Sequence, residues 1–272
     1  MESLQVFRAN SVVTVTINQP KKKNAIDETM WGGLTDIFRE IAGNANDRVV
    51  VVTGAGQDFC SGADLSLRGS GSGAGSGASA GSGERRENVH RLAAMRRVND
   101  ACIALHRLPQ PTIAKVRGVS VGAGCNLALG CDLVVASETA RFSEIFARRG
   151  LSLDFGGSWV LPRRIGMHRA KELAFFAEIV GAADALEMGL VNRVLPDDKL
   201  DDFVASWASK LASGPPIALA QTKRLLNNSL NVTLEESLDD EAAAQTVNFS
   251  TEDTAEAMRA FIEKRDPKFT GR

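Results

Sequence analysis

The chain has 272 residues, of which 44% are hydrophobic and 24% charged, and its formal net charge at pH 7 is −1. This composition is typical of a globular protein, and the balanced charge argues against the basic surface that nucleic acid or an anionic membrane would attract. No apolar run approaches the roughly 20 residues of a membrane span, and no basic segment leads into an apolar core at the start. We therefore expect a cytoplasmic protein without nucleic-acid or membrane partners.

Two strands, a loop, a helix and a third strand are predicted at the start of the chain. Apolar residues in alternation or in short β-branched runs predict the strands, and helical spacing predicts a helix capped by Asp27. The strands cover residues 5–8, 11–17 and 49–53, and the helix covers 29–42. The loop at 18–24 carries three lysines, which could bind an anionic ligand or lie in solvent.

The stretch Gly54–Leu65 follows the apolar strand at 49–53 and is rich in small residues. Small residues let a backbone approach a ligand closely, and a bent backbone can direct an N–H group outward to stabilise a developing oxyanion. For this stretch alone, an ordinary β-turn is an equal alternative.

A second small-residue stretch, at 118–126, follows a predicted strand at 111–116 and opens a helix that ends at Gly130. A second N–H group exposed at this turn could bind the same thioester oxygen as the first. The stretch also contains the Gly-x-Ser-x-Gly pattern of serine hydrolases. No histidine lies near the C-terminal end, however, so we interpret Ser120 as a small turn residue.

Helices dominate the rest of the pattern, beginning with one over residues 84–108. The run of glycine, serine and alanine at 69–83 predicts a flexible loop, either a flap or a surface insertion. Further strands are predicted at 132–136, 140–143 and 191–195, and further helices at 156–165, 169–178, 202–212, 217–226, 234–247 and 253–264, with one more opened by a capping box at Asp184–Glu187.

The two small-residue stretches, in this order, resemble the enoyl-CoA hydratase/isomerase (crotonase) family. The matching segments are Phe59–Leu65, Gly118–Leu133, Gln19–Ile26 and Gly150–Gly166. The resemblance implies an α/β fold with a crotonase-like spiral core of ββα turns over residues 1–196. It implies that residues 197–272 are a C-terminal helical trimerisation region, which in the family builds homotrimers, often paired into hexamers.

The resemblance also implies an acyl-CoA thioester substrate, so that coenzyme A enters with the substrate and not as a separate cofactor. The backbone N–H groups of Ala63 and Ala123 would form the oxyanion hole. The residues implied to line the CoA moiety are Lys21, Ala25, Ser61, Gly62, Ala63, Asp64, Leu65, Gly122 and Ala123. No metal site is expected, because the four cysteines lack metal-site spacing and are interpreted as reduced thiols.

The proton carrier is where this chain departs from the hydratases it resembles. Those hydratases use two glutamates, and the motifs align Asn126 and Phe146 with them; neither side chain can transfer a proton. Asp154 stands where hydratases usually carry glycine, and double-bond isomerases, ring-opening epoxide isomerases and an aryl-CoA dehalogenase are similar here in carrying Asp. One carboxylate suffices for a 1,3-proton shift. We therefore predict an isomerase with Asp154 as acid and base, closer to the Asp-bearing members than to two-glutamate hydratases.

Three alternatives remain for this region. Asp154 could cap the helix that starts near Gly156. Glu144 could be the acid or base of a hydratase, because strand alternation places it on the face of Phe146, although an exposed strand charge is the simpler expectation. The protein could also bind CoA thioesters without catalysis.

Overall fold

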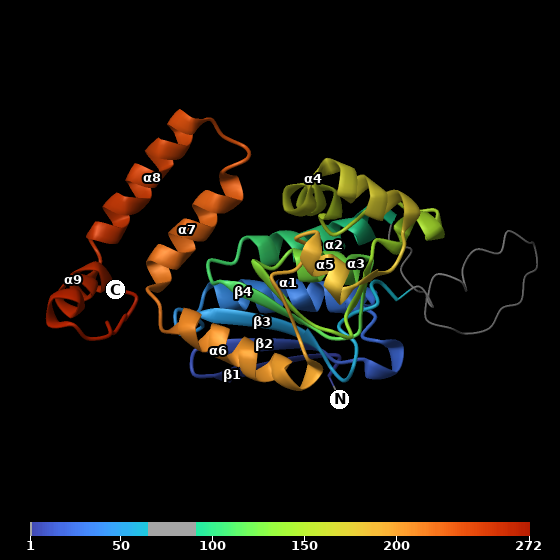
Figure 1. Cartoon of the computed structure of the whole chain (residues 1–272), viewed down its shortest axis with the longest axis horizontal. Helices are drawn as coiled ribbons and strands as arrows, with labels where there is room; N and C mark the ends of the chain where they lie inside the picture. The colour runs from blue at the N-terminus through green and yellow to red at the C-terminus, as the bar shows by residue number, and fades with distance from the viewer. Residues whose placement is uncertain (1, 65–90) are drawn as a thin grey trace, which may run out of the picture.

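The computed structural model describes residues 2–64 and 91–272. Three predicted features lie outside the described residues: Leu65, the loop at 69–83 and the start of the helix at 84–108. The described strands form two sheets. The larger one has the order β1 (Leu4–Ala9), β2 (Val12–Ile17), β3 (Val49–Gly54), β4 (Thr112–Val116), β6 (Leu133–Ser137) and β9 (Arg193–Leu195) (Figure 1). Its first pair is antiparallel and the other pairs are parallel.

Strand β3 is buried on both faces, which explains its unbroken apolar run. Val50 and Val52 belong to the larger hydrophobic core, which also holds residues of α1 (Glu28–Ala42) and α2 (Arg91–His106). Val49 and Val51 pack on the opposite face against α6 (Leu200–Ala212). Figure 1 shows α6 on one side of the sheet and α1 and α2 on the other. Helix α1 begins as predicted, because the Asp27 side chain accepts hydrogen bonds from the next residues.

The smaller sheet contains two short strands that the sequence pattern did not predict. It has the order β5 (Val119–Val121), β7 (Arg141–Ser143) and β8 (Val180–Gly181). Strand β5 lies inside the second small-residue stretch, between Gly118 and Gly122, which both have a positive φ. Helix α3 (Ala123–Leu129) starts immediately after it. The stretch therefore folds as turn, strand and helix.

Helices α4 and α5 differ from the predicted segments in different ways. Helix α4 (Gly157–Phe176) spans both predicted segments, and Gly166, with φ 77°, breaks it where the gap was expected. Helix α5 (Ala182–Glu187) is preceded by Gly181 and has no side-chain cap, so the predicted capping box at Asp184 is wrong. A capping box does form further on, between Thr233 and Glu236.

The C-terminal helices extend from the core as an arm made of α7 (Pro216–Asn228), α8 (Leu234–Phe249) and α9 (Glu252–Glu263) (Figure 1). The last residues fold back, because the Arg48 guanidinium donates to the carbonyl oxygens of Ala212 (3.2 Å) and Phe269 (3.0 Å). Three short 3₁₀ helices connect described elements at Pro20–Lys22 (η1), Ile145–Arg149 (η2) and Asp197–Lys199 (η3). Within residues 2–64 and 91–272, none of the helices has the length and apolar character to cross a membrane.

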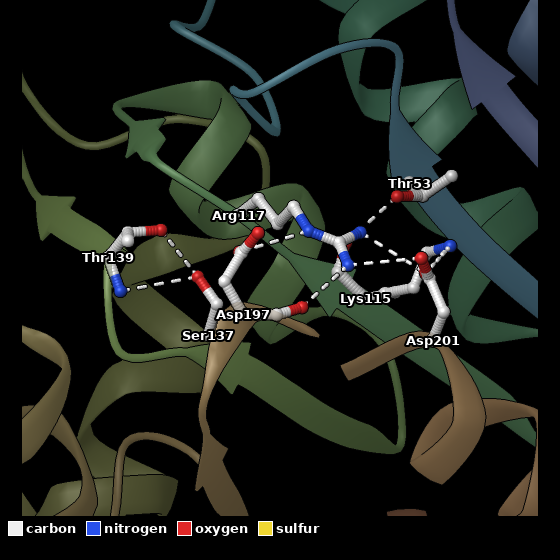
Figure 2. Close-up of polar contacts among 7 residues, drawn as sticks. All are labelled: Thr53, Lys115, Arg117, Ser137, Thr139, Asp197 and Asp201. Atoms are coloured by element: carbon white, nitrogen blue, oxygen red, sulfur yellow. Dashed lines mark hydrogen bonds and ion pairs between the residues drawn. The ribbon is translucent and has the colours of Figure 1, made fainter. Parts of the chain in front are cut away.

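An ion-pair network fastens α6 to the sheet, as Figure 2 shows. The Arg117 guanidinium, just after β4, donates to Asp197 Oδ1 (3.0 Å) and to both carboxylate oxygens of Asp201 (3.1 and 3.2 Å). Lys115 reaches the same Asp201 carboxylate at 2.7 Å. The network therefore joins the end of a central strand to the helix that covers one face of the sheet.

Candidate active site

The two small-residue stretches lie side by side. Cys60 and Ser120 form a parallel bridge, in which the Cys60 N–H donates to the Val119 carbonyl oxygen and the Val121 N–H donates to the Cys60 carbonyl oxygen, both at 2.9 Å. A Cβ built on Gly124 would collide with the Cys60 carbonyl oxygen. Only glycine therefore permits this approach, and the sequence signal of small residues has a steric cause.

Ala63 and Ala123 present their amides at this junction. A Cβ on Gly62 would lie 3.5 Å from the Ala123 nitrogen, so the residue before Ala63 packs directly against the second turn. Across the described part of the chain, neither amide donates to a protein acceptor. Two N–H groups on adjoining turns, both without a described protein partner, are an arrangement suited to binding one oxyanion.

The residues expected to line the CoA moiety come from two segments that run together. Ile26 bridges Ala63: its N–H donates to the Gly62 carbonyl oxygen, and the Asp64 N–H donates back to the Ile26 carbonyl oxygen, both at 2.8 Å. The Ser61 N–H donates to the Lys23 carbonyl oxygen at 3.0 Å. These contacts bring the segment around Ala25 beside Ser61–Asp64, and Gly62 in turn packs on Gly122 and Ala123 through the Val121 carbonyl oxygen. Lys21 lies in η1, and no contact among the described residues joins it to this edge. Leu65 lies outside the described residues.

Two polar residues that sequence reasoning passed over hold these turns in place. Asn24 is fully buried, and its Nδ2 donates to the carbonyl oxygens of Ala55 (2.9 Å) and Asp58 (2.6 Å). Asp58 Oδ1 accepts from the Val119 N–H at 2.9 Å. A further contact joins Lys22 to Asp64 at 2.7 Å, and this hydrogen bond raises the pKa of Lys22. In the sequence, the only sign of the role of Asn24 is its position directly before Ala25 and Ile26, which are both buried.

Asp154 lies in the loop between η2 and α4 and is half-buried. Its carbonyl oxygen accepts from the Gly157 N–H (3.0 Å) and from Asn126 Nδ2 (2.9 Å). The N-cap of α4 is Gly156, without a side-chain cap, so the alternative of Asp154 as the helix cap is wrong. Burial raises the pKa of the Cys102 thiol to about 11, with the Asp154 charge adding to the rise, so Cys102 lies near this carboxylate.

The positions aligned with the two hydratase glutamates carry no acid. Asn126 is fully buried in α3, and Phe146 is 6% exposed. The Phe146 ring packs near the second turn, where a Cβ on Gly122 would lie 3.7 Å from Cζ. Neither side chain can give or take a proton at neutral pH.

Glu144 is only 1% exposed, so the expectation that it is an exposed charge on a strand is wrong. Strand alternation does not relate it to Phe146 either, since β7 ends at Ser143 and Phe146 lies in the 3₁₀ helix η2. Glu144 Oε2 accepts from Asn126 Nδ2 at 3.2 Å, and burial raises the pKa of its carboxyl to about 7. Its place beside Asn126 could not be predicted from sequence spacing.

The serine-hydrolase pattern has a structural explanation. Ser120 is fully buried in β5, and its hydroxyl donates to the Gly124 carbonyl oxygen at 3.4 Å. His168 is exposed, and His106 packs edge-on to Trp159. Across the described residues, no cluster of three or more His, Cys, Asp or Glu side chains could hold a metal ion.

Comparisons with known proteins identify the family. The profile of the family described as enoyl-CoA hydratase/isomerase matches residues 8–272. The chain is 34% identical to 1,2-epoxyphenylacetyl-CoA isomerase of Escherichia coli over all of both chains. It is also 34% identical to short-chain-enoyl-CoA hydratase of Clostridium acetobutylicum, over 95% of this chain and 94% of that one.

A solved structure gives the same result for the fold. The enoyl-CoA hydratase of Bacillus anthracis superposes with a TM-score of 0.90 at 32% identity and covers all of both chains. The predicted α/β crotonase fold, with its C-terminal helices, is thereby confirmed. The protein belongs to the enoyl-CoA hydratase/isomerase family of acyl-CoA enzymes.

Proposed function

We propose that this protein isomerises the double bond of an enoyl-CoA thioester through an enolate, with Asp154 as the acid and base. The Ala63 and Ala123 N–H groups bind the thioester carbonyl oxygen. The Asp154 carboxylate removes a proton from the α-carbon of a 3-enoyl thioester, and the electron pair moves into the carbonyl. Return of that proton to the γ-carbon shifts the double bond, so one carboxylate serves both steps.

The observation that carries this proposal is the chemistry of three positions near α3. Asn126 and Phe146 are buried and cannot transfer a proton, whereas Asp154 is half-buried and hydrogen-bonded through its backbone to Asn126. A water-adding mechanism with two glutamates lacks both of its acids at those positions. The name of the Escherichia coli relative, an isomerase, supports the same choice.

Hydration of the double bond is the second candidate. The name of the Clostridium relative favours it. So does Glu144, because a carboxyl with a pKa of about 7 is suited to acid–base catalysis near neutral pH. Its 1% exposure argues against direct contact with water or substrate. A CoA-thioester-binding protein without catalysis is the third candidate, and Asn126 and Phe146 are the residues that favour it.

Proton exchange tests these candidates directly. Wild type, Asp154→Asn and the matched control Asp36→Asn, at an exposed position on α1, are mixed with 3-enoyl-CoA and 2-enoyl-CoA in deuterated water. Label and product are followed by mass spectrometry and NMR. We expect wild type and the control to shift the double bond and incorporate label, and Asp154→Asn to lose about 10²-fold or more in rate.

Two results would contradict the proposal. Hydration that survives Asp154→Asn would assign the chemistry to another acid, with Glu144 the first to replace. Binding of acyl-CoA without reaction of either substrate would favour the binding-protein alternative.

A further inference from the structure

Glu144 is a buried carboxyl that the proposed chemistry does not use. It follows β7 directly and is 1% exposed. Carboxyl groups are seldom fully buried without a partner that holds them there. Its described partners are the Cys125 thiol, which donates to it, and Asn126 Nδ2. Its other oxygen, Oε1, is buried and accepts no hydrogen bond from the described residues.

Asn126 connects Glu144 to the loop of Asp154. The Asn126 Nδ2 group lies 3.2 Å from Glu144 Oε2 and 2.9 Å from the Asp154 carbonyl oxygen. An amide nitrogen carries two hydrogens, so it can donate to both acceptors at once. If the amide were turned over, its oxygen would face two acceptors and be repelled. The two acceptors, Glu144 Oε2 and the Asp154 carbonyl oxygen, therefore fix which way the Asn126 amide points.

The amide also has little room to move. A Cβ on Gly157 would lie 2.8 Å from Asn126 Cγ, so the amide packs flat against the backbone at the start of α4. The amide is thus hydrogen-bonded to Glu144 and packed against Gly157. One rotamer of Asn126 is thereby selected.

The loop that Asn126 reaches has a backbone that needs support. Phe155 has φ 45° and Gly156 has φ 76°, directly after Asp154. A positive φ is unfavourable for a phenylalanine, and such conformations persist where neighbouring contacts fix them. The Phe155 ring packs on Trp31, with a centroid separation of 5.3 Å, and the Asp154 carbonyl accepts from Asn126. These contacts hold the backbone that carries the Asp154 carboxylate.

We propose that Glu144 is a positioning residue: its carboxyl oxygen Oε2 orients the Asn126 amide, which in turn holds the backbone of Asp154 at the site. The chain thus uses an acid and an amide to place a single catalytic acid. The inference rests on the proposed role of Asp154 for its effect on catalysis, but its effect on the loop is independent of that role.

Three variants separate positioning from chemistry. Glu144→Gln keeps the size of the side chain and an acceptor oxygen for Asn126, Glu144→Leu removes the acceptor, and Asn126→Ala removes the amide. We expect Glu144→Leu and Asn126→Ala to lower kcat for double-bond migration about 10²-fold with KM within about threefold of wild type, because misplacement of a catalytic group acts on the chemical step. Glu144→Gln should keep most of the wild-type kcat, because its side-chain oxygen can still accept from Asn126.

Hydrogen–deuterium exchange of residues 150–160 gives a readout that needs no activity. We expect faster exchange there in Glu144→Leu and Asn126→Ala than in wild type or Glu144→Gln. If Glu144→Leu does not fold, the exchange rates of residues 150–160 in Asn126→Ala and Glu144→Gln are compared instead.

The outcomes are distinct for the two proposals. Loss of kcat in Glu144→Gln equal to that in Asp154→Asn would make Glu144 a proton carrier and overturn the positioning role. Unchanged exchange at 150–160 in Asn126→Ala would overturn it as well. If no variant or wild type isomerises the substrate while the exchange pattern is as expected, only the proposed function fails.

Discussion

Gly62 packs directly on Val121: a Cβ at position 62 would lie 2.9 Å from the Val121 carbonyl oxygen. The φ of Gly62 is 90°, which side chains rarely adopt. The same contact sets the separation of the two turns that present Ala63 and Ala123. The spacing of the proposed oxyanion hole therefore depends on a missing methyl group.

Gly62→Ala should lower the rate of label exchange about 10²-fold, because displacing one donor of an oxyanion hole has an effect of that order. Gly189→Ala is the matched control, since Gly189 has φ 82° but no atom closer than 3.8 Å to an added Cβ. Both variants add backbone strain, and only Gly62→Ala adds the collision at the site. Equal rates in the two variants would show that the close approach is not needed for catalysis.

Glu144 should make the stability of the chain fall as the pH rises. The pKa of its carboxyl is about 7 in the folded chain and 4.5 for the ordinary group. Between these values the folded chain keeps a proton that the unfolded chain releases, so the free energy of unfolding drops by about 3 kcal/mol from pH 4.5 to pH 7. Below 4.5 and above 7 this contribution is constant. The ionisable groups that face Glu144 are Cys125 and Asp154.

Urea unfolding across this pH range measures the effect. The stability difference between Glu144→Gln and wild type should change in favour of the variant as the pH rises from 4.5 to 7. Glu138→Gln, at an exposed position, is the control and should keep a constant difference from wild type. A constant difference for Glu144→Gln as well would mean that its carboxyl is ionised in the folded chain throughout.

Arg117→Met should weaken the attachment of α6 to the sheet. The guanidinium makes two hydrogen bonds to the Asp201 carboxylate and two to Asp197, one to its side chain and one to its carbonyl oxygen, and the Arg117 side chain is 20% exposed. Because the two carboxylates are largely in solvent, we expect a loss of only about 1–2 kcal/mol in the free energy of unfolding, smaller at high salt. Lys199→Met, which breaks an exposed pair with Asp198, should leave the urea midpoint unchanged. If the loss in stability of Arg117→Met did not depend on salt, it would come from lost packing and not from the ion pairs.

The C-terminal arm should associate with other copies of the chain. Its exposed side chains include many large apolar ones, among them Leu226, Leu230, Leu234, Phe249 and Phe261. An apolar surface of this kind marks an interface, and we propose that it builds the homotrimer or dimer of trimers that the resemblance implies. Sedimentation equilibrium should give three or six times the chain mass of 29.0 kDa.

A double variant tests the surface itself. Leu234→Glu with Phe261→Glu should shift the protein toward monomer. Phe7→Glu, at an exposed position on β1, should not. A wild-type protein that sediments as a monomer would contradict the proposal.

The sequence pattern predicted the long elements and both turns because their signals are local. The apolar run at 49–53 and the spacing in 29–42 each identify an element without reference to the rest of the chain. Strand β8, with two residues, has no pattern of its own and exists because it pairs with β7. The capping box at Asp184 was wrong because Gly181 already starts α5, one turn earlier than the motif suggested.

The candidate site was predictable in part for the same reason. Ala63, Ala123 and Asp154 belong to motifs that can be read along the chain. The burial of Glu144 could not be read in this way, because it follows from packing against α3, 18 residues earlier in the sequence. Nor could the link from Asn126 to the Asp154 carbonyl, which spans 28 residues.

The return of the last residues to Arg48 has a consequence for synthesis on the ribosome. Arg48 precedes the central strand β3, and it donates to the carbonyl oxygen of Phe269. Asp253 likewise accepts hydrogen bonds from the backbone of Thr270 and Gly271. The growing chain can form its sheet before these contacts exist, since domains fold as they emerge. The hydrogen bond that ties the last residues to the core therefore forms only after translation has passed Phe269.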